Sequence, residues 1–315
     1  MRFALERDIK PLCPAVTTGL KPIENQYMIL IADSGSTKTD WRFINAGSHI
    51  FPFATAGFNP YFTDSVQMAL SIETDLKPGL MPHLSSGKLQ IYFYGAGCGN
   101  EKNCSIIRRA LEEQFPKSEI HIFSDMLAAA HALCGQTPGL VGILGTGMNS
   151  ALYDGTKIVS QQPSLGYVLG DEGSGANLGK LLLADYLNKE MPEAMLKRFD
   201  ARFRFSKEDI LEKVYKEPQP NRFLASFSLF IYQNLSQQYC VDLVAGAFRQ
   251  FFDLHIRKYP EYKSLKLSCS GSVAFWYSNI LRTIAEEKGV MLDKVVETPI
   301  AGLSLYHLEK HINAG

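Results

Sequence analysis

The most constraining feature of this 315-residue sequence is a pattern that occurs twice. In each copy an apolar run ends in a tight turn of small residues, an alternating run returns, and a second turn leads into a third run. The copies start roughly 110 residues apart and both read as three-stranded β-meanders. The expected strands lie near residues 28–33, 38–44 and 48–53, and then near 140–144, 149–153 and 157–160. Such a duplication predicts two similar α/β domains, each presenting a glycine-containing hairpin turn.

The first turn, Asp33 to Thr37, admits two interpretations. Its N–H groups and hydroxyls could cradle phosphate beside an acid able to hold a cation. An ordinary hairpin with a glycine turn would have the same sequence. The stretch is not a Walker A loop, because the G-x-x-x-x-G-K-[ST] spacing is absent and a strand follows where a helix should. The turn alone leaves both interpretations open.

A strand–helix–strand run follows the first meander, over 89–94, 102–115 and 119–123, and predicts a right-handed parallel crossover. Asp125 then lies between the carboxyl end of a strand and the start of an apolar helix, where open α/β sheets place chemistry. A helix N-cap aspartate would look the same, and in isolation that interpretation is favoured. His131, inside the same apolar helix, is expected to be a core residue rather than a base.

Two further stretches combine small and polar residues ahead of a helix. Gly166–Gly175 places glycines, two acids and a serine before a helix over 176–188. Such a loop is costly to order for packing alone, so we favour a ligand-facing loop over one whose acids merely favour the helix dipole. Cys269–Ala274 follows a strand expected at 265–268 and leads into a helix expected over 273–287. That turn leaves room for a flat ring, but it also suits plain strand-to-helix packing.

Composition argues against several classes of function. Lys plus Arg equals Asp plus Glu at 32 each, so no general attraction to nucleic acid or to an anionic membrane is expected. No apolar run reaches the roughly 18 residues that a membrane span needs. The six cysteines form no C-x-x-C pair, which argues against a metal cluster or a disulfide framework. With no signal peptide apparent, the sequence indicates a cytoplasmic protein.

The length suits two compact domains. Residues 1–27 show no clear period and are interpreted as an extension without an assigned function. The first domain is expected to span 28–137, and a C-terminal helix over 299–312 is expected to pack back onto it. The second domain is expected to span 138–298.

Together these motifs resemble the sugar kinase, Hsp70 and actin superfamily. More narrowly, they resemble the ATPase family that holds N-acetylglucosamine kinases and the activator ATPases of benzoyl-CoA reductase and 2-hydroxyacyl-CoA dehydratase. The resemblance covers nearly all of 28–312 and keeps the family's order of motifs. It implies an α/β fold with two actin-like (ribonuclease H-like) domains flanking a cleft for ATP and sugar. It also implies the cofactors ATP and Mg²⁺ and, as a family expectation, a homodimer.

The resemblance assigns roles to individual residues. Asp33 would organise Mg²⁺ through water, and Asp125 stands where sugar kinases keep the catalytic aspartate. The residues that match the ATP-binding motifs are Gly35, Ser36, Thr37 and Lys38, then Gly145, Thr146 and Gly147, and finally Gly271 and Ser272. The residues that match hexosamine-binding positions are Asn59, Asn149 and Asp171.

Two departures from the family pattern bear on the substrate. The kinases usually carry Gly-Trp-Gly ahead of the Gly-Asp-Glu-Gly loop, whereas this chain has Ser164-Leu165-Gly166, so the stacking surface of the Trp is lost. Met148 replaces a usual Ser in the second turn. No cysteine motif suited to the activators' 4Fe–4S cluster is present, and no helix-turn-helix or zinc motif typical of the related repressors.

The predicted activity is ATP-dependent phosphorylation of an amino sugar, N-acetylglucosamine at its 6-hydroxyl. The expected partner is therefore a small-molecule sugar, with neither nucleic acid nor membrane involved. One alternative is an ATPase that drives or activates a partner protein. A second alternative is a sensor that binds sugar or nucleotide without turnover.

Overall fold

The computed structural model describes residues 16–17, 27–35 and 38–312. The chain divides into two compact units: unit 1 runs up to Ala128 and includes the C-terminal segment from Ile300, and unit 2 is Ala129–Pro299. The division falls inside helix α4 (Asp125–Cys134), ahead of the expected boundary at 137/138. The second half of α4 packs within unit 2, where Lys294 Nζ donates to the carbonyl of Leu133 at 2.8 Å.

Unit 1 is built on a mixed sheet with the strand order β1-β4-β3-β2-β5-β6. β2, β3 and β4 form the antiparallel meander, and β5 and β6 continue parallel to β2. The carboxyl ends of β2, β5 and β6 are level, because Ser34 pairs with Gly95 and Gly95 pairs with Ser124. The strands are β1 (Val16–Thr17), β2 (Tyr27–Ser34), β3 (Lys38–Ile44), β4 (His49–Ala56), β5 (Lys88–Gly95) and β6 (Glu119–Ser124).

Part of residues 1–27, where the sequence shows no clear period, belongs to this sheet. Val16 pairs with Ile50 and Thr17 with His49, antiparallel to β4, and Tyr27 already begins β2. A two-residue strand is held by backbone pairing, which side-chain periodicity does not report. The remainder of that segment lies outside the described residues.

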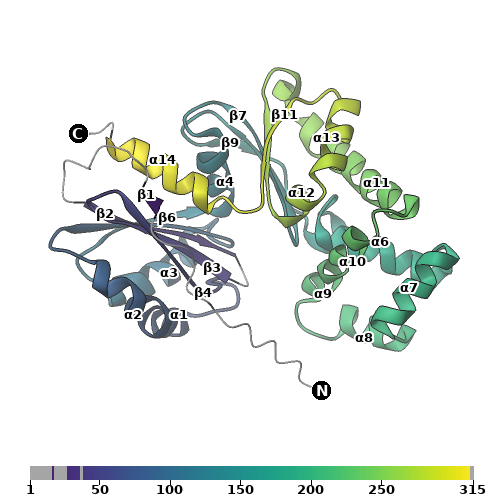
Figure 1. The fold of residues 1–315 in the computed structure, drawn as a ribbon, viewed down its shortest axis with the longest axis horizontal. Helices are drawn as coiled ribbons and strands as arrows, with labels where there is room; N and C mark the ends of the chain where they lie inside the picture. The colour runs from purple at the N-terminus through teal and green to yellow at the C-terminus, as the bar shows by residue number, and fades with distance from the viewer. Residues whose placement is uncertain (1–15, 18–26, 36–37, 313–315) are drawn as a thin grey trace. The chain divides into compact units, whose positions relative to one another are not determined.

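Helices cover both faces of the unit 1 sheet (Figure 1). Alternate residues of β2, such as Leu30, pack with α1 and α3, while Ile29 and Ile31 are buried on the face where α14 contacts β2 and β3. Tyr94 Oη and His307 Nε2 lie 2.9 Å apart and join β5 to α14. The helices are α1 (Ser65–Ser71), a π-helical turn (Ile72–Leu76), α2 (Lys77–Leu80), a 3₁₀ turn (Met81–His83), α3 (Glu101–Gln114) and α14 (Ile300–Ile312).

Unit 2 repeats this topology. Its sheet has the order β11-β10-β7-β8-β9, in which β7, β8 and β9 form the antiparallel meander and β10 and β11 run parallel to β7. The α/β duplication expected from the two meanders is therefore confirmed. The strands are β7 (Gly139–Leu144), β8 (Met148–Tyr153), β9 (Ile158–Gln161), β10 (Leu267–Ser270) and β11 (Leu292–Val296).

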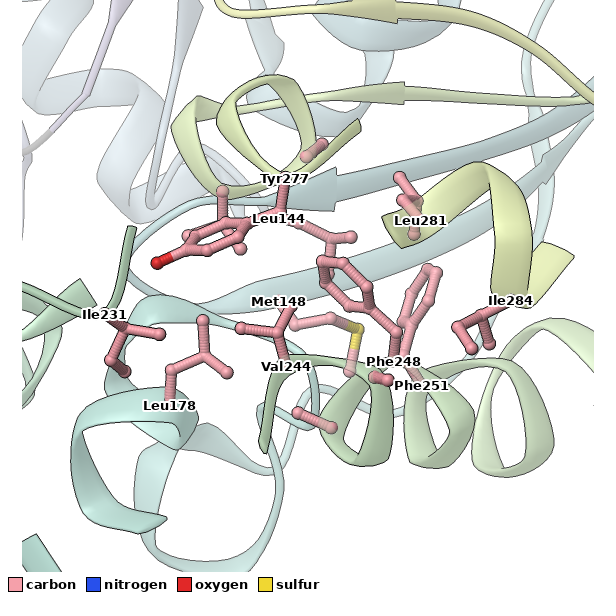
Figure 2. Close-up of a cluster of buried hydrophobic side chains, with 14 of the residues drawn as sticks. Leu144, Met148, Leu178, Ile231, Val244, Phe248, Phe251, Tyr277, Leu281 and Ile284 are labelled. Carbon is pink, nitrogen blue, oxygen red and sulfur yellow. The ribbon is translucent and has the colours of Figure 1, made fainter. Parts of the chain in front are cut away.

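Most of the helices of unit 2 lie between β9 and β10 in the sequence. Their apolar side chains pack against the sheet and form the core of the unit. Figure 2 shows Phe248 and Phe251 of α11 facing Leu144 and Tyr277, and each of these side chains is almost fully buried. The helices are α5 (Gly166–Leu169), α6 (Gly175–Asn188), α7 (Glu193–Phe203), α8 (Lys207–Tyr215), α9 (Pro220–Ser226), α10 (Ser228–Gln233), α11 (Gln238–Leu254), two 3₁₀ turns (Ile256–Lys258 and Pro260–Lys263), α12 (Ser272–Trp276) and α13 (Ser278–Glu287).

Three local expectations in unit 2 are wrong in detail. The strand expected at 265–268 lies two residues later, because β10 pairs with β7 as far as Ser270 opposite Ile143. The helix expected over 273–287 is interrupted at Tyr277, whose backbone leaves the helical region. The loop expected over Gly166–Gly175 begins with the short helix α5.

Among the described residues, no helix combines the length and apolarity needed to cross a membrane. The five cysteines that the structure describes are free thiols. His131 is buried beside the Tyr153 ring, which confirms its assignment to the core.

Candidate functional site

Acidic side chains gather at the carboxyl edge of the unit 1 sheet. Asp33 is near the end of β2 and pairs in register with Asp40 of β3, and Asp125 directly follows β6. Burial, then the nearby charges of Asp40 and Asp125, raise the pKa of Asp33 to about 7, against the opposing effect of Lys38. The strand order therefore brings Asp33 and Asp125, which are distant in sequence, within electrostatic reach of one another.

Asp125 is not the N-cap of α4, contrary to the interpretation favoured in isolation. The hydroxyl of Ser124 accepts the N–H of Leu127 at 3.3 Å, which is the bond a capping residue makes, and Asp125 is the first helical residue. Asp125 Oδ1 accepts the N–H of Met126 at 2.8 Å. Burial raises the pKa of Asp125, although the N–H groups of Met126 and of Asp125 itself lower it. A carboxylate with a raised pKa at a helix N-terminus is a suitable proton acceptor.

The first turn closes through a hydrogen bond from Gly35 N to the carbonyl of Lys38 at 3.0 Å. Ser36 and Thr37 lie outside the described residues, so their predicted contact with phosphate stays a prediction. Lys38 Nζ is 2.6 Å from Asp40 Oδ1, and its side chain is largely exposed. Lys38 therefore begins β3 paired with an acid at the edge of the site.

Ser34 belongs to the stretch whose hydroxyls could cradle phosphate, but its side chain is buried within unit 1. Its Oγ lies 2.7 Å from Thr39 Oγ1 and accepts the N–H of Phe58 at 3.0 Å, and both hydroxyl side chains are buried. These bonds hold the loop that contains Asn59 against the end of β2. Asn59 Oδ1 accepts the N–H of Tyr61, and a Cβ added at Gly97 would lie 2.9 Å from it. Asn59 is therefore held at the same edge of the sheet as Asp33.

No group of three His, Cys, Asp or Glu side chains among the described residues could hold a metal ion. One or two carboxylates are nevertheless enough for Mg²⁺, which usually keeps several waters and also binds substrate phosphates, and Asp33 and Asp125 offer two. Burial raises the pKa of Asp33 most, and the neighbouring charges of Asp40 and Asp125 raise it further, so a cation would favour the ionised carboxylate. The donor set therefore fits a cation held through water.

Replacing Asp33 with asparagine is expected to stabilise the ligand-free protein at pH 8 by about 1–3 kcal/mol. Folding raises the pKa of Asp33 from 3.8 to about 7, so the ionised carboxylate destabilises the native state. Wild-type stability should consequently fall as pH rises from about 4 to 7, and the variant should lack this loss. Thermal unfolding in chelator at pH 4 and pH 8 measures the difference.

The control for that measurement is Asp154→Asn in the exposed β8–β9 hairpin. The pKa of Asp154 is lowered, first by the N–H of Lys157, so its removal should give no gain at pH 8. Equal stability of wild type and Asp33→Asn at pH 8 would contradict the expectation.

In unit 2, four glycines meet at the second turn. Gly175 N donates to the carbonyl of Gly145 at 2.8 Å, and Gly145 N donates to the carbonyl of Gly147 at 3.0 Å. Gly271 has φ +115°, and a Cβ there would lie 2.3 Å from the carbonyl oxygen of Leu144. The turn and the Cys269–Ala274 motif are thus in backbone contact, which requires glycine at position 271. Thr146 is exposed at the tip of the turn.

The Cys269–Ala274 motif opens onto an apolar pocket of about 280 Å³ within unit 2. Ser272 lines this pocket. The ring centroids of Tyr232 and Trp276 are 5.2 Å apart, in an edge-to-face arrangement. Such a pocket suits a flat ring. Its lining residues are Ser228, Leu229, Tyr232, Gln233, Ser272, Val273, Trp276 and Tyr277.

The remaining predicted sugar residues, Asn149 and Asp171, both lie in unit 2 and already have partners. Asn149 Oδ1 accepts from Gln161 Nε2 at 2.8 Å, across β8 and β9. Asp171 Oδ1 accepts the N–H of Met148 at 3.2 Å. Burial raises the pKa of Asp171, and that N–H lowers it. Leu165, where the family usually has Trp, is 56% exposed.

Sequence reasoning missed several residues of these two sites. Asp40 could have been found, because the hairpin turn places it opposite Asp33. Tyr232 carries no local signal, since α10 reaches the pocket only through tertiary packing. The same is true of His255, whose Nε2 lies 2.8 Å from Glu172 Oε2 in the Gly170–Gly175 loop.

Comparison with known proteins gave matches among solved structures. No family model matches the chain, and no curated protein does. A candidate N-acetylglucosamine kinase from Porphyromonas gingivalis is 40% identical, with a TM-score of 0.84 over 91% of this chain and 100% of that one.

Two more distant structures share the fold. A candidate N-acetylglucosamine kinase from Chromobacterium violaceum has a TM-score of 0.69 at 18% identity, over 89% of this chain and 98% of that one. A ROK-family glucokinase from Streptomyces griseus, solved with glucose and AMPPNP, has a TM-score of 0.50 at 13% identity, over 89% and 97%.

Proposed function

Since the chain belongs to the N-acetylglucosamine kinase-like family of the sugar kinase, Hsp70 and actin superfamily, we propose that it phosphorylates an amino sugar with ATP. We propose N-acetylglucosamine as the acceptor and its 6-hydroxyl as the attacking group. The observation that supports this best is the placement of Asp33 and Asp125 at the level ends of β2 and β6, close enough for the charge of Asp125 to raise the pKa of Asp33.

In this proposal unit 1 supplies the acids. Asp125 accepts the proton of the sugar hydroxyl, a role typically worth about 10²–10⁴-fold in rate. Its raised pKa brings the carboxylate closer to the working pH, which favours proton transfer. Asp33 would hold Mg²⁺ through water, and a bound ion would supply charge neutralisation at the phosphates. Gly35, Ser36, Thr37 and Lys38 form the first phosphate turn.

Unit 2 supplies the nucleotide site. The base occupies the pocket beside Tyr232 and Trp276, where aromatic edges and apolar side chains surround a space suited to a flat ring. Gly145, Thr146 and Gly147 form the second phosphate turn, in which the Gly145 N–H closes onto the Gly147 carbonyl and the N–H groups of Thr146 and Gly147 are assigned to phosphate. Gly271 and Ser272 lie between that turn and the pocket, so the motif borders both.

The sugar is assigned to Asn59 and Asn149, whose amides can pair with hydroxyl and N-acetyl groups. The family resemblance also assigns Asp171 to the sugar, although its carboxylate is already bonded to Met148. With Leu165 in place of the family's usual Trp, this region lacks an aromatic surface. The test therefore includes acceptors other than N-acetylglucosamine.

The test is ADP release measured with ATP and Mg²⁺, with no sugar and with N-acetylglucosamine, N-acetylmuramic acid, glucosamine or glucose. We expect N-acetylglucosamine to stimulate release at least about tenfold, because closure on the acceptor limits transfer to water. Phosphorus NMR of the product then identifies the phosphorylated hydroxyl.

The other outcomes separate the alternatives. Turnover that no sugar changes would contradict the kinase and favour an ATPase that drives a partner protein. Binding of nucleotide and sugar without any turnover would favour a sensor.

A further inference from the structure

The second phosphate turn is held in place by the loop that follows α5. Gly175 N donates to the carbonyl of Gly145 at 2.8 Å, and Ala176 N donates to the carbonyl of Thr146 at 3.0 Å. At the start of β8 the hydrogen bond runs from the turn to the loop, since Met148 N donates to Asp171 Oδ1 at 3.2 Å. The loop and the start of α6 therefore bind the backbone on both sides of the turn.

Asp171 is built for this contact. Its φ of +61° is a left-handed conformation, which aspartate tolerates better than most residues but which still costs free energy. Its side chain is buried, and a Cβ added at Gly147 would lie 3.1 Å from Oδ2. The carboxylate thus lies directly against the turn, with one oxygen bonded to it.

A second layer fixes the loop from behind. His255 Nε2 lies 2.8 Å from Glu172 Oε2, and both side chains are largely buried. His255 follows the end of α11, and its ring stacks on Phe251 of the core. Gly173 N donates to Asn177 Oδ1 at 3.2 Å, so α6 holds the loop as well.

We propose that Asp171 is a positioning residue of the second phosphate turn, supported by the Glu172–His255 pair, and that its loss weakens nucleotide binding. This inference rests on the proposed function, in which Gly145–Gly147 contacts phosphate. It gives the Asp171 carboxylate a task at the nucleotide turn, through Oδ1, besides the sugar role that the family resemblance implies. A phosphate-binding turn needs its N–H groups preorganised, and the loop bonds provide that order.

The decisive variant is Asp171→Gly, because glycine adopts φ +61° without strain while removing the acceptor. We expect the Kd for ADP, measured by calorimetry without sugar, to rise about tenfold, since Met148 N–H loses its partner. Asp171→Asn retains an acceptor oxygen and tolerates the same backbone, so it should keep the Kd within about twofold. His255→Phe, which preserves the ring contact but not the bond to Glu172, should raise the Kd by about threefold.

Three results would overturn this inference. One is an unchanged Kd in Asp171→Gly with a higher KM for sugar, which would limit the carboxylate to a sugar role and leave the proposed kinase function intact. Another is an equal loss of affinity in Asp171→Asn and Asp171→Gly. The third is an unchanged Kd in His255→Phe. Failure of every sugar to stimulate the wild type would instead reject the proposed function, and the binding data would still be interpretable.

Discussion

Replacing Asp125 with asparagine is expected to lower the rate of phosphoryl transfer about 10²–10⁴-fold while leaving nucleotide affinity nearly unchanged. The amide cannot accept the proton of the attacking hydroxyl at neutral pH. It can still accept the N–H of Met126 through its oxygen, so the start of α4 should persist. Single-turnover transfer to the stimulating sugar measures the rate, and calorimetry with ADP measures the affinity.

The comparison variant for Asp125 is Ser124→Ala, which removes the capping bond to Leu127 but not the acid. It should cost about 1 kcal/mol of stability with a far smaller effect on transfer. Full kinase activity in Asp125→Asn would reject Asp125 as the proton acceptor. A large loss of ADP affinity in that variant would place the carboxylate on the nucleotide.

Replacing Gly271 with alanine is expected to destabilise unit 2 by about 3 kcal/mol and to remove most nucleotide binding. A Cβ there would lie 2.3 Å from the Leu144 carbonyl oxygen and 3.1 Å from Gly145 N, and both atoms are backbone. The φ of +115° adds strain for any residue with a side chain. Relief requires β10 to move away from the second turn, which separates the pocket from the phosphate site.

Thermal unfolding and ADP calorimetry test this expectation. Gly246→Ala in α11 is the matched control, because nothing lies within 4 Å of its added Cβ and alanine favours a helix. That control should be neutral or slightly stabilising. Wild-type stability and affinity in Gly271→Ala would show that the close approach to Leu144 is not required.

The fold was largely predictable because its strongest signal is repeated. Each meander is ambiguous alone, but two copies followed by parallel strands leave few topologies, and both sheets have the resulting order. The register of the strands was harder to predict from the sequence. The strand expected at 265–268 lies at Leu267–Ser270, since pairing with β7, rather than local apolarity, determines where β10 ends.

The positions of the candidate site residues in the fold were predictable where these residues belong to short motifs, while their roles stay predictions. Asp33, Asp125 and the glycines of unit 2 stand at strand ends, a position that sequence order alone can locate. The sequence favours Asp125 as the N-cap of α4, whereas Ser124 makes the capping bond. The two residues are adjacent and both can cap a helix, so the sequence could not separate them. Tyr232 and His255 were not found, because each reaches its partner only through packing of helices that carry no motif.

The contact of α14 with β2 and β3 affects how the chain matures on the ribosome. The strands of unit 1 are synthesised before unit 2, yet the helix that covers Ile29 and Ile31 is synthesised after unit 2. Unit 2 is continuous in sequence and can finish folding while that apolar face is still open. The order of completion is therefore the reverse of the order of synthesis. Exposure of nascent unit 1 to chaperones and to aggregation lasts until α14 has emerged.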